Sequence, residues 1–463
     1  MTFRERASVA LGSPKTLATD DGARRLAGKR DVAVAEYPAM DAMRDRAREI
    51  RMHTLARLDE YLGPLADRVE ERGGTVFFAA DADEANDYIR RLAADRGVET
   101  IVKSKSMVTE EIELNDSLER DGLRVVETDL GEFIIQLAHD KPSHIIAPVL
   151  HKTRFEIGEL FANEIDATYT DDPFELNAIA RRYLREIFLS ADMGISGVNF
   201  AAADTGTMVT VTNEGNARLC TTAPRIHVAV MGMERVVPTL DDMQVMLEVL
   251  ARSATGQRLS VYTNFITGAR RPGDADGPEE FHLVILDNGR SRVLGSGSAE
   301  ILGCIRCGAC LNICPVYRHA GGHAYGGTYS GPIGAVLAPV LQEDDGFSDL
   351  PYASSLCGAC RDVCPIRLDI PSMLLGLRQE FTRAGETEYG WLGPGLSAYA
   401  RVATTPFLWR AFLAAGGVFG RTVGRDGYIT KLPFHAGNWT TTRDLPAPAA
   451  RSFHSWWKEH RGT

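Results

Sequence analysis

The chain has 463 residues, of which 44% are hydrophobic and 24% are charged, as is usual for a soluble globular protein. This length is too great for one ordinary core, so we expect two or three domains. The formal net charge of −11, with no long block of lysine or arginine, argues against nucleic acid or an anionic membrane as a partner.

The sequence shows no evident targeting or membrane-spanning segment. Its start lacks an apolar stretch followed by a small-residue cleavage site, so we expect no secretion signal. No window supplies the roughly 18 apolar residues that a membrane helix needs, and the nearest one, 404–424, is interrupted by Arg410. We expect that segment to be a core or partner-facing helix, with contact to a membrane surface as the alternative, and we expect no transmembrane segment.

Residues 1–70 have the apolar spacing of helices and predict a helical lead-in that Gly73 and Gly74 end.

From 71 to 298, short apolar runs alternate with helical patterns. The runs 75–80, 100–105, 123–129 and 144–148 predict strands. The helix after the first run should begin near Asp81 and end at Gly97. Strands separated by helices indicate an α/β domain with a largely parallel sheet.

Two candidate ligand-binding segments lie in this domain. Lys103 and Lys105 follow a predicted strand, at the edge where open α/β sheets bind ligands, and either could pair with a carboxylate. The segment 201–218 places short polar residues between two predicted strands, where they could form either an anion-binding turn or an ordinary hairpin. Its candidates are Asp204, Thr205, Gly206 and Asn216.

Seven of the eight cysteines lie in two short runs, "CIRCGACLNICP" (304–315) and "SSLCGACRDVCP" (354–365). The spacing C-x2-C-x2-C-x3-C-P is typical of proteins with two iron–sulfur clusters, in which each run sends its fourth cysteine to the other cluster. Cysteines grouped in this way are metal ligands, and they favour the reducing cytoplasm over an oxidising compartment.

This arrangement predicts the ligands of two iron–sulfur clusters. The first is a [4Fe–4S] cluster, and three cysteines remain for the second. The first set is Cys304, Cys307, Cys310 and Cys364, and the second is Cys314, Cys357 and Cys360.

The second site lacks one cysteine, because Ser354 stands where the first run has Cys304. It could hold a [3Fe–4S] cluster, which needs three thiolates. It could instead hold a [4Fe–4S] cluster whose fourth ligand is Ser354, Ser355, water, Cys220 or a residue of another chain. A serine alkoxide is a harder and more basic ligand than a thiolate, which weakens the case for serine.

Zinc is the alternative metal for these cysteines. Two structural zinc sites would need eight donors, and the glycines between the ligands favour iron–sulfur, because they let the backbone approach inorganic sulfide. Forty-two residues separate Cys314 from Cys357 and include a helical pattern. That long helical connection predicts an all-helical ferredoxin-like module, which we place at 299–378. His319 and His323 could adjust its potential through hydrogen bonds.

The last segment, 379–463, contains all five tryptophans and has too little periodicity for a domain of its own. We expect a helical and extended tail that packs on another surface.

Three regions of the sequence resemble the LutB/YkgF family of bacterial L-lactate utilisation proteins. They are the cysteine runs with "PVYRHAGGHAYGGTYSGPIGAVLAP", the α/β stretches "IVKSKSMVTEEIELNDSLERDG" and "GVNFAAADTGTMVTVTNEGNARL", and the ending "RDLPAPAARSFHSWW". The resemblance implies a LUD domain at 71–298, with a fold related to sugar-phosphate isomerases and CoA-transferases (NagB/RpiA/CoA-transferase-like). It also implies two partner subunits, a cysteine-rich-domain protein and a second LUD protein.

The resemblance further implies that the system oxidises L-lactate to pyruvate and passes the electrons through the clusters. No dinucleotide fingerprint or P-loop is present, so we expect an electron-transfer subunit, located in the cytoplasm or at the membrane periphery. The alternatives are a subunit that binds and oxidises lactate itself, and a redox-sensing or structural iron–sulfur protein.

Overall fold

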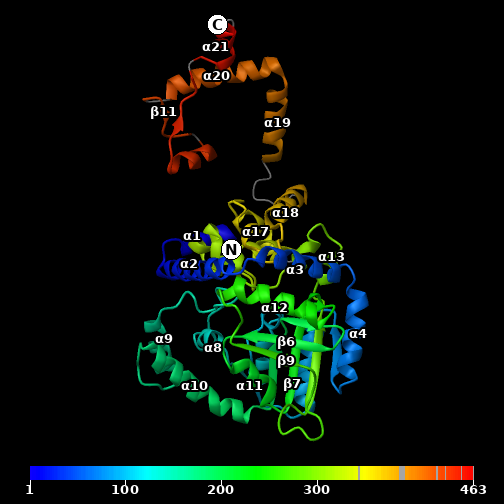
Figure 1. The fold of residues 1–463 in the computed structure, drawn as a ribbon. Coiled ribbons are helices and arrows are strands. Elements are labelled where there is room, and N and C mark those ends of the chain that lie inside the picture. Colours follow the sequence, from blue (N-terminus) through cyan, green and yellow to red (C-terminus); the bar gives the residue numbers. More distant parts are fainter. Residues whose placement is uncertain (343–344, 385–391, 424–425, 433, 450, 462–463) are drawn as a thin grey trace. The chain divides into compact units, whose positions relative to one another are not determined.

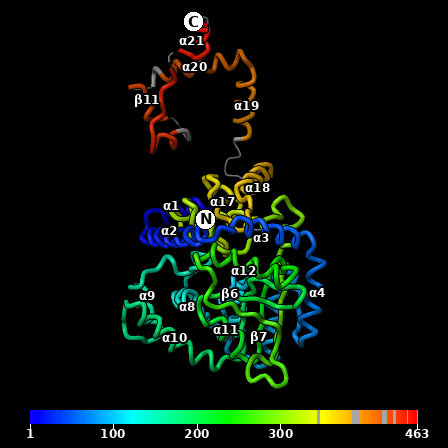
Figure 2. The backbone as a smooth tube through the Cα atoms, viewed as in Figure 1, coloured from blue at the N-terminus to red at the C-terminus, as the bar shows by residue number. Residues whose placement is uncertain are grey.

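The computed structural model describes residues 1–342, 345–384, 392–423, 426–432, 434–449 and 451–461. The chain divides into two compact units, Met1–Arg383 and Ala384–Thr463, and each is described here by itself. In the first unit, the N-terminal helices and the cysteine-rich segment lie together at one end of an α/β body (Figure 1), and the backbone tube shows the same grouping (Figure 2).

A six-stranded sheet forms the centre of the first unit. Every neighbouring pair of its strands is parallel, which confirms the predicted α/β class, and helical crossovers make such a pairing possible. In sheet order the strands are β1 (Thr75–Ala79), β10 (Glu280–Leu286), β7 (Ile226–Gly232), β4 (Met193–Gly197), β2 (Thr100–Lys103) and β3 (Arg124–Glu127).

Both faces of this sheet are covered, and for that reason the central strands are buried and mostly apolar on both faces. In β7, Val228 and Val230 pack into the layer that contains α5, whereas Ala229 and Met231 pack into the core on the opposite face. The helices of the α/β body are α4 (Leu58–Glu70), α5 (Ala82–Asp95), α6 (Met107–Glu111), α7 (Leu114–Arg120), α8 (Leu130–Leu137), α9 (Arg154–Glu164), α10 (Pro173–Ser190), α11 (Asn216–Thr222) and α12 (Leu240–Thr255).

A second sheet of four short strands packs against the first through the core that also contains α12. β5 pairs antiparallel with β6 and parallel with β8, and β6 pairs antiparallel with β9. The strands are β8 (Val236–Val237), β5 (Phe200–Ala202), β6 (Thr207–Thr212) and β9 (Tyr262–Ile266).

The cysteine-rich segment is helical, and the N-terminal helices pack on it. α2 contacts α14, α15 and α12, so it joins the cysteine-rich segment to the α/β body. Buried residues of both parts, such as Leu250 and Ile333, belong to one continuous core. The helices are α1 (Phe3–Ala10), α2 (Pro14–Ala35), α3 (Met40–Leu55), α13 (Arg290–Leu294), α14 (Ala309–Ile313), α15 (Pro315–Ala320), α16 (Gly331–Leu341), α17 (Ala359–Val363) and α18 (Ile370–Ala384).

The strand predicted at 144–148 is wrong. The segment forms bends and turns, and its backbone is satisfied by a side chain instead of by a neighbouring strand. The amides of Ile146 and Ala147 donate to Nδ1 of His144, at 3.1 and 3.2 Å. A local side-chain acceptor of this kind competes with a sheet ladder, and here it holds the segment as a turn.

The second unit contains α19 (Leu392–Thr404), α20 (Pro406–Val423), β11 (Tyr428–Ile429), β12 (Leu445–Pro446) and α21 (Phe453–His460). Trp409 packs with Tyr399 and Phe412, while Trp391 lies outside the described residues. In the described part of the chain, no single helix is both long and apolar enough to span a membrane. The segments Gly393–Thr404 and Pro406–Gly420 are apolar enough only as a pair, and they meet at a bend of 106°.

Candidate metal centres and the adjoining cavity

The two cysteine runs fold into loops of the same conformation. In the first loop, Arg306 and Gly308 have positive φ angles of 57° and 74°, and α14 follows. In the second, Leu356 and Gly358 occupy the same places with φ of 54° and 84°, and α17 follows. Each short helix ends at the fourth position of the run, Cys314 or Cys364, and α14 packs against α17. The repeat in the sequence is therefore a repeat in the backbone.

The first predicted ligand set is brought together around one small cavity. It is lined by Cys304, Cys307, Cys310 and Cys364 together with apolar side chains that include Ile305, Ile333 and Ile366. Cys364 comes from the second loop, 54 positions after Cys310 by sequence number, and the structure places it in the cavity of the first set. Burial, followed by the neighbouring Cys364 and Cys304, raises the pKa of the Cys307 thiol.

The second set also lies close together. Burial and the neighbouring Cys314 raise the pKa of Cys360 to about 12, and Cys357 contributes to the same shift. Cys314 and Cys360 are buried, and Cys357 is exposed. Thiols that lie together can bind one metal centre as thiolates, so both groups contain the donors of a metal site.

Backbone amides point at the sulfur atoms, as iron–sulfur sites require. The amide of Arg306 donates to Cys304 Sγ at 3.3 Å, and that of Leu368 donates to Cys364 Sγ at 3.4 Å. In the second loop the amide of Leu356 donates to Ser354 Oγ at 3.1 Å, which is the counterpart of the Arg306–Cys304 contact. The Ser354 hydroxyl therefore occupies the place of the missing sulfur. The donor set, the amides and the positive-φ glycines together fit iron–sulfur clusters.

The other residues considered for the clusters have different partners. Cys220 is fully buried in the α/β body, where its sulfur lies 3.2 Å from Thr128 Oγ1. His319 Nδ1 contacts the carbonyl of Pro315, and His323 Nε2 contacts the carbonyl of Lys141. His323 also lies near Asp140 and His151, but Asp140 already pairs with Lys152 at 2.9 Å, so that group is an ordinary polar cluster.

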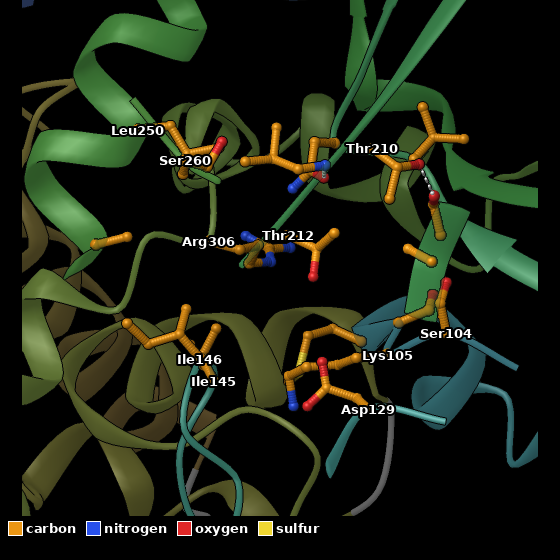
Figure 3. A pocket seen from close by; sticks show the side chains of 18 of the residues that line it. Ser104, Lys105, Asp129, Ile145, Ile146, Thr210, Thr212, Leu250, Ser260 and Arg306 are labelled. Atoms are coloured by element: carbon orange, nitrogen blue, oxygen red, sulfur yellow. Dashed lines mark hydrogen bonds between the residues drawn. The ribbon is translucent and has the colours of Figure 1, made fainter. Parts of the chain in front are cut away.

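A cavity of about 360 Å³ adjoins the first cysteine loop inside the first unit. Its wall combines the ends of β2 and β4, strand β6, helix α12 and Arg306 of the cysteine loop. Figure 3 shows Arg306 in the middle of this space, with Lys105 and Asp129 together on one side. The cavity has an apolar part, formed by residues such as Ile145, Ile146 and Leu250.

The two candidate lysines are already neutralised. Lys103 is buried and pairs with Glu127 at 2.7 Å, away from the cavity wall. Lys105 lines the cavity but forms an ion pair with Glu132. Burial lowers the pKa of Lys105, but Glu132 and other carboxylates outweigh it and leave that pKa above its ordinary value.

The remaining predicted pocket residues separate into two places. Asn216 lines the cavity, at the start of α11. Asp204, Thr205 and Gly206 are not part of the cavity wall and form the turn between β5 and β6, where Gly206 has a φ of 62°. In that turn, Asp204 Oδ2 accepts a hydrogen bond from the amide of Leu240 at 3.4 Å. The structure thus shows the hairpin alternative for these three residues.

Carboxyl groups gather at the Lys105 side of the cavity. Burial and the nearby Glu214 raise the pKa of Asp129 to about 7, and burial also raises the pKa of Glu214. Glu110, just behind this wall, has a pKa raised to about 8 by burial and by Glu132. These groups share their few cations, so some of them are protonated at neutral pH.

A buried charged network forms another part of the cavity wall. Glu234 is 1% exposed and pairs with Arg290 at 2.7 Å, Arg235 at 3.5 Å and Arg306 at 3.7 Å. Arg290 also pairs with Glu111 at 2.9 Å, and Tyr329 Oη donates to the same carboxylate at 2.6 Å. This network was not predicted from the sequence, in which its one local signal is an arginine inside a cysteine run.

Comparisons with known proteins cover almost the whole chain. Three family models match it: the LUD domain at residues 64–286, the 4Fe-4S dicluster domain at 300–368, and the C-terminal domain of lactate utilisation protein B at 395–462.

Several curated proteins are similar over their full length. A protein of Bacillus licheniformis called lactate utilization protein B is 48% identical and covers 99% of this chain and 97% of its own. Its namesakes are 46% identical in Bacillus subtilis, covering 99% and 96%, and 48% identical in Geobacillus kaustophilus, covering 92% and 90%. A solved DUF162 family structure from Deinococcus radiodurans has a TM-score of 0.29 at 13% identity, covers 50% of this chain and 98% of that one, and is too distant to bear on the fold.

Proposed function

Because the chain belongs to the lactate utilization protein B family, we propose that it is the iron–sulfur electron-transfer subunit of a system that oxidises L-lactate to pyruvate. The observation that carries this proposal is the gathering of seven cysteines into two groups through the packing of α14 on α17. Bound clusters would supply one-electron transfer. Two clusters with an exchanged ligand are suited to passing electrons between partners.

We assign a [4Fe–4S] cluster to the first group of cysteines. For the second group we propose a [4Fe–4S] cluster held by three thiolates, with the Ser354 hydroxyl facing its fourth corner. Ser354 accepts a hydrogen bond from the backbone of its loop just as Cys304 does in the first loop. This equivalence supports a four-iron cluster over a three-iron cluster.

The proposed partners are the two other subunits, a cysteine-rich-domain protein and a second LUD protein. Oxidation of the lactate hydroxyl to a ketone removes two electrons and two protons, whereas an iron–sulfur cluster takes one electron. A two-electron acceptor held elsewhere in the complex accounts for that difference. The proposed location is the cytoplasm, where the cluster thiolates stay reduced before assembly.

The test begins with the full chain purified without oxygen. We expect about eight irons and eight sulfides per chain and a low-temperature EPR signal on reduction. Cys307→Ala should lose about half of the iron, while Cys220→Ala, which changes a cysteine of the α/β core, should keep all of it. Stoichiometric zinc without labile sulfide would contradict the proposal.

The role in lactate oxidation has a separate test. L-lactate should reduce the clusters when both partner subunits are present and leave them oxidised when the chain is alone. Reduction of the isolated chain by L-lactate would support the alternative, a subunit that oxidises lactate itself. The observation that favours this second candidate function is the cavity next to the first cysteine loop, which could hold lactate.

A further inference from the structure

The cavity beside the first cysteine loop contains one buried cation whose donors have no partner. Arg306 is 7% exposed, and none of its three guanidinium nitrogens has a hydrogen-bond partner. Its neighbours are the Tyr329 ring, which it approaches face-on at 4.8 Å from the centroid, the distant Glu234 carboxylate and the Cys304 sulfur. A guanidinium carries five N–H donors, and a buried set without acceptors is costly, so the site is built for an acceptor that the chain does not supply.

We propose that this cavity binds a small carboxylate of the 2-hydroxy or 2-oxo acid class and that Arg306 holds the carboxylate group. The choice of that class rests on the proposed function, whereas the anion site itself rests on the geometry. A planar guanidinium accepts a carboxylate through two parallel hydrogen bonds, which makes arginine the suited partner.

The other cations of the cavity leave Arg306 as the anchor. Lys105 is engaged by Glu132, and Arg290 is engaged on both sides by Glu111 and Glu234. Arg235 pairs with Glu234 and donates to the carbonyl of Cys304 at 3.5 Å. Among the cavity-lining residues described, Arg306 thus has the largest unused donor capacity.

The remaining walls orient a ligand of this kind. Lys105 is engaged by Glu132, and the acidic side chains Asp129 and Glu214 lie on its side of the cavity, so the arginine side is the favourable place for the carboxylate group. Side chains such as Asn199 and Thr212 offer partners for a hydroxyl or keto oxygen, and Val198 and Leu250 offer contact for an apolar tail. The volume of about 360 Å³ is at the small end for ligand pockets.

A ligand held there would lie next to the first metal centre. The backbone amide of Arg306 donates to Cys304 Sγ, so one residue contacts both the predicted cluster ligand and the cavity. An added negative charge in a buried site disfavours further negative charge nearby. Carboxylate binding should therefore lower the reduction potential of one cluster, which provides a readout that does not depend on turnover.

The experiment uses the full chain with its clusters in place, titrated anaerobically with L-lactate, D-lactate, pyruvate and inorganic phosphate by calorimetry. We expect saturable binding of L-lactate or pyruvate, at least tenfold weaker binding in Arg306→Gln, and partial recovery in Arg306→Lys. Arg361→Gln is the matched control, because Arg361 also lies beside a cluster cysteine but is exposed and pairs with Asp369 outside the cavity. It should change the affinity less than twofold.

Iron content and the EPR spectrum of each variant show whether a loss of binding is a loss of the cluster. If Arg306→Gln loses iron, Ala251→Leu is the variant that tests ligand binding. It narrows the cavity from α12 and lies outside both cysteine loops. It should weaken binding at least tenfold with full iron content.

Unchanged binding in Arg306→Gln or Ala251→Leu with intact clusters would overturn the inference, as would equal binding of phosphate. A chain with two iron–sulfur clusters and no carboxylate binding would refute the cavity assignment and leave the electron-transfer role intact. Carboxylate binding by a chain that holds zinc would support the cavity assignment and refute the electron-transfer role.

Discussion

Arg290 holds two buried carboxylates together, and its replacement by methionine tests how much this network stabilises the fold. Its Nη1 and Nη2 each lie 2.9 Å from an oxygen of Glu111, and its Nε lies 2.7 Å from Glu234. All three side chains are 1% exposed. Methionine fills similar space without charge and leaves both carboxylates without their main partner. Removing one member of a buried ion pair costs about 3–5 kcal/mol.

The pKa of Glu234 gives a second magnitude for the same network. Burial alone would raise that pKa, but Arg290, Arg235 and Arg306 outweigh it and lower the pKa from 4.5 to about 2. A tenfold change in proton affinity is worth about 1.4 kcal/mol, so ionised Glu234 stabilises the folded state by about 3 kcal/mol at neutral pH. Because the folded pKa is depressed, this contribution is complete above pH 4.5 and is lost as the pH falls toward about 2.

The assay is thermal melting of the anaerobic protein at one scan rate. With an unfolding entropy of about 2 cal/mol/K per residue, a loss of 3–5 kcal/mol in the first unit lowers its melting midpoint by about 4–6 °C. Arg96→Met is the matched control, because Arg96 also pairs with a glutamate at 2.8 Å but is 42% exposed. Exposed pairs contribute less than about 1 kcal/mol, so that midpoint should move by about 1 °C or less. Equal shifts in the two variants would refute the reasoning.

Three further changes have clear expected outcomes. Ser354→Cys adds a fourth thiolate to the second cluster, so after brief exposure to air it should lack the three-iron EPR signal that the wild type then shows; the same signal in both would count against Ser354 at the open corner. Gly322→Ala would place its Cβ 1.8 Å from the carbonyl oxygen of Ser143, and it should lower the melting midpoint, whereas Gly376→Ala, in open space on α18, should keep or raise it. Burial and nearby acids raise the pKa of Asp129 to about 7, so the protonated side chain favours the folded state. This contribution is complete below pH 3.8 and is lost as the pH rises through 7. Asp129→Asn should flatten the fall of stability over that range in pH-dependent melting, and an unchanged pH profile would contradict the assignment.

The elements that could be predicted from the sequence depend on short-range chemistry. Asp81 caps α5 through its side chain, which accepts from the amide of Glu84 at 2.9 Å, and a short polar residue before a helical pattern signals this directly. The grouping of the cysteines also depends on local spacing, because the first loop fixes three sulfurs within seven residues and the second loop fixes two in the equivalent positions. Only the exchange of Cys314 and Cys364 spans the two loops, and the known ferredoxin pattern supplied it.

One failure originates in a local side chain, and the others originate in contacts between distant segments. The run 144–148 has the composition of a strand. The side chain of His144 accepts hydrogen bonds from two of its amides, and the segment forms a turn instead. Lys103 and Lys105 were placed correctly at a strand end, but their carboxylate partners come from β3 and α8 and could not be seen in the local sequence. The cavity combines segments from residue 104 to residue 329, so no local pattern could have located it.

The buried charges explain why the α/β body and the cysteine loops form one unit. Four arginines lie around the first loop, Arg51, Arg235, Arg290 and Arg306, and the described glutamates that pair with them there are Glu111 and Glu234. Arg51 is also fixed by carbonyl groups of both parts, Val236 in the α/β body and Leu302 before the first cysteine. Burying more positive than negative charge is unfavourable unless an anion accompanies it. A cluster ligated by four thiolates carries negative charge, and a bound carboxylate adds more. The excess of buried arginine around the first loop therefore has its counterpart in the negative charge of the groups that this region would hold.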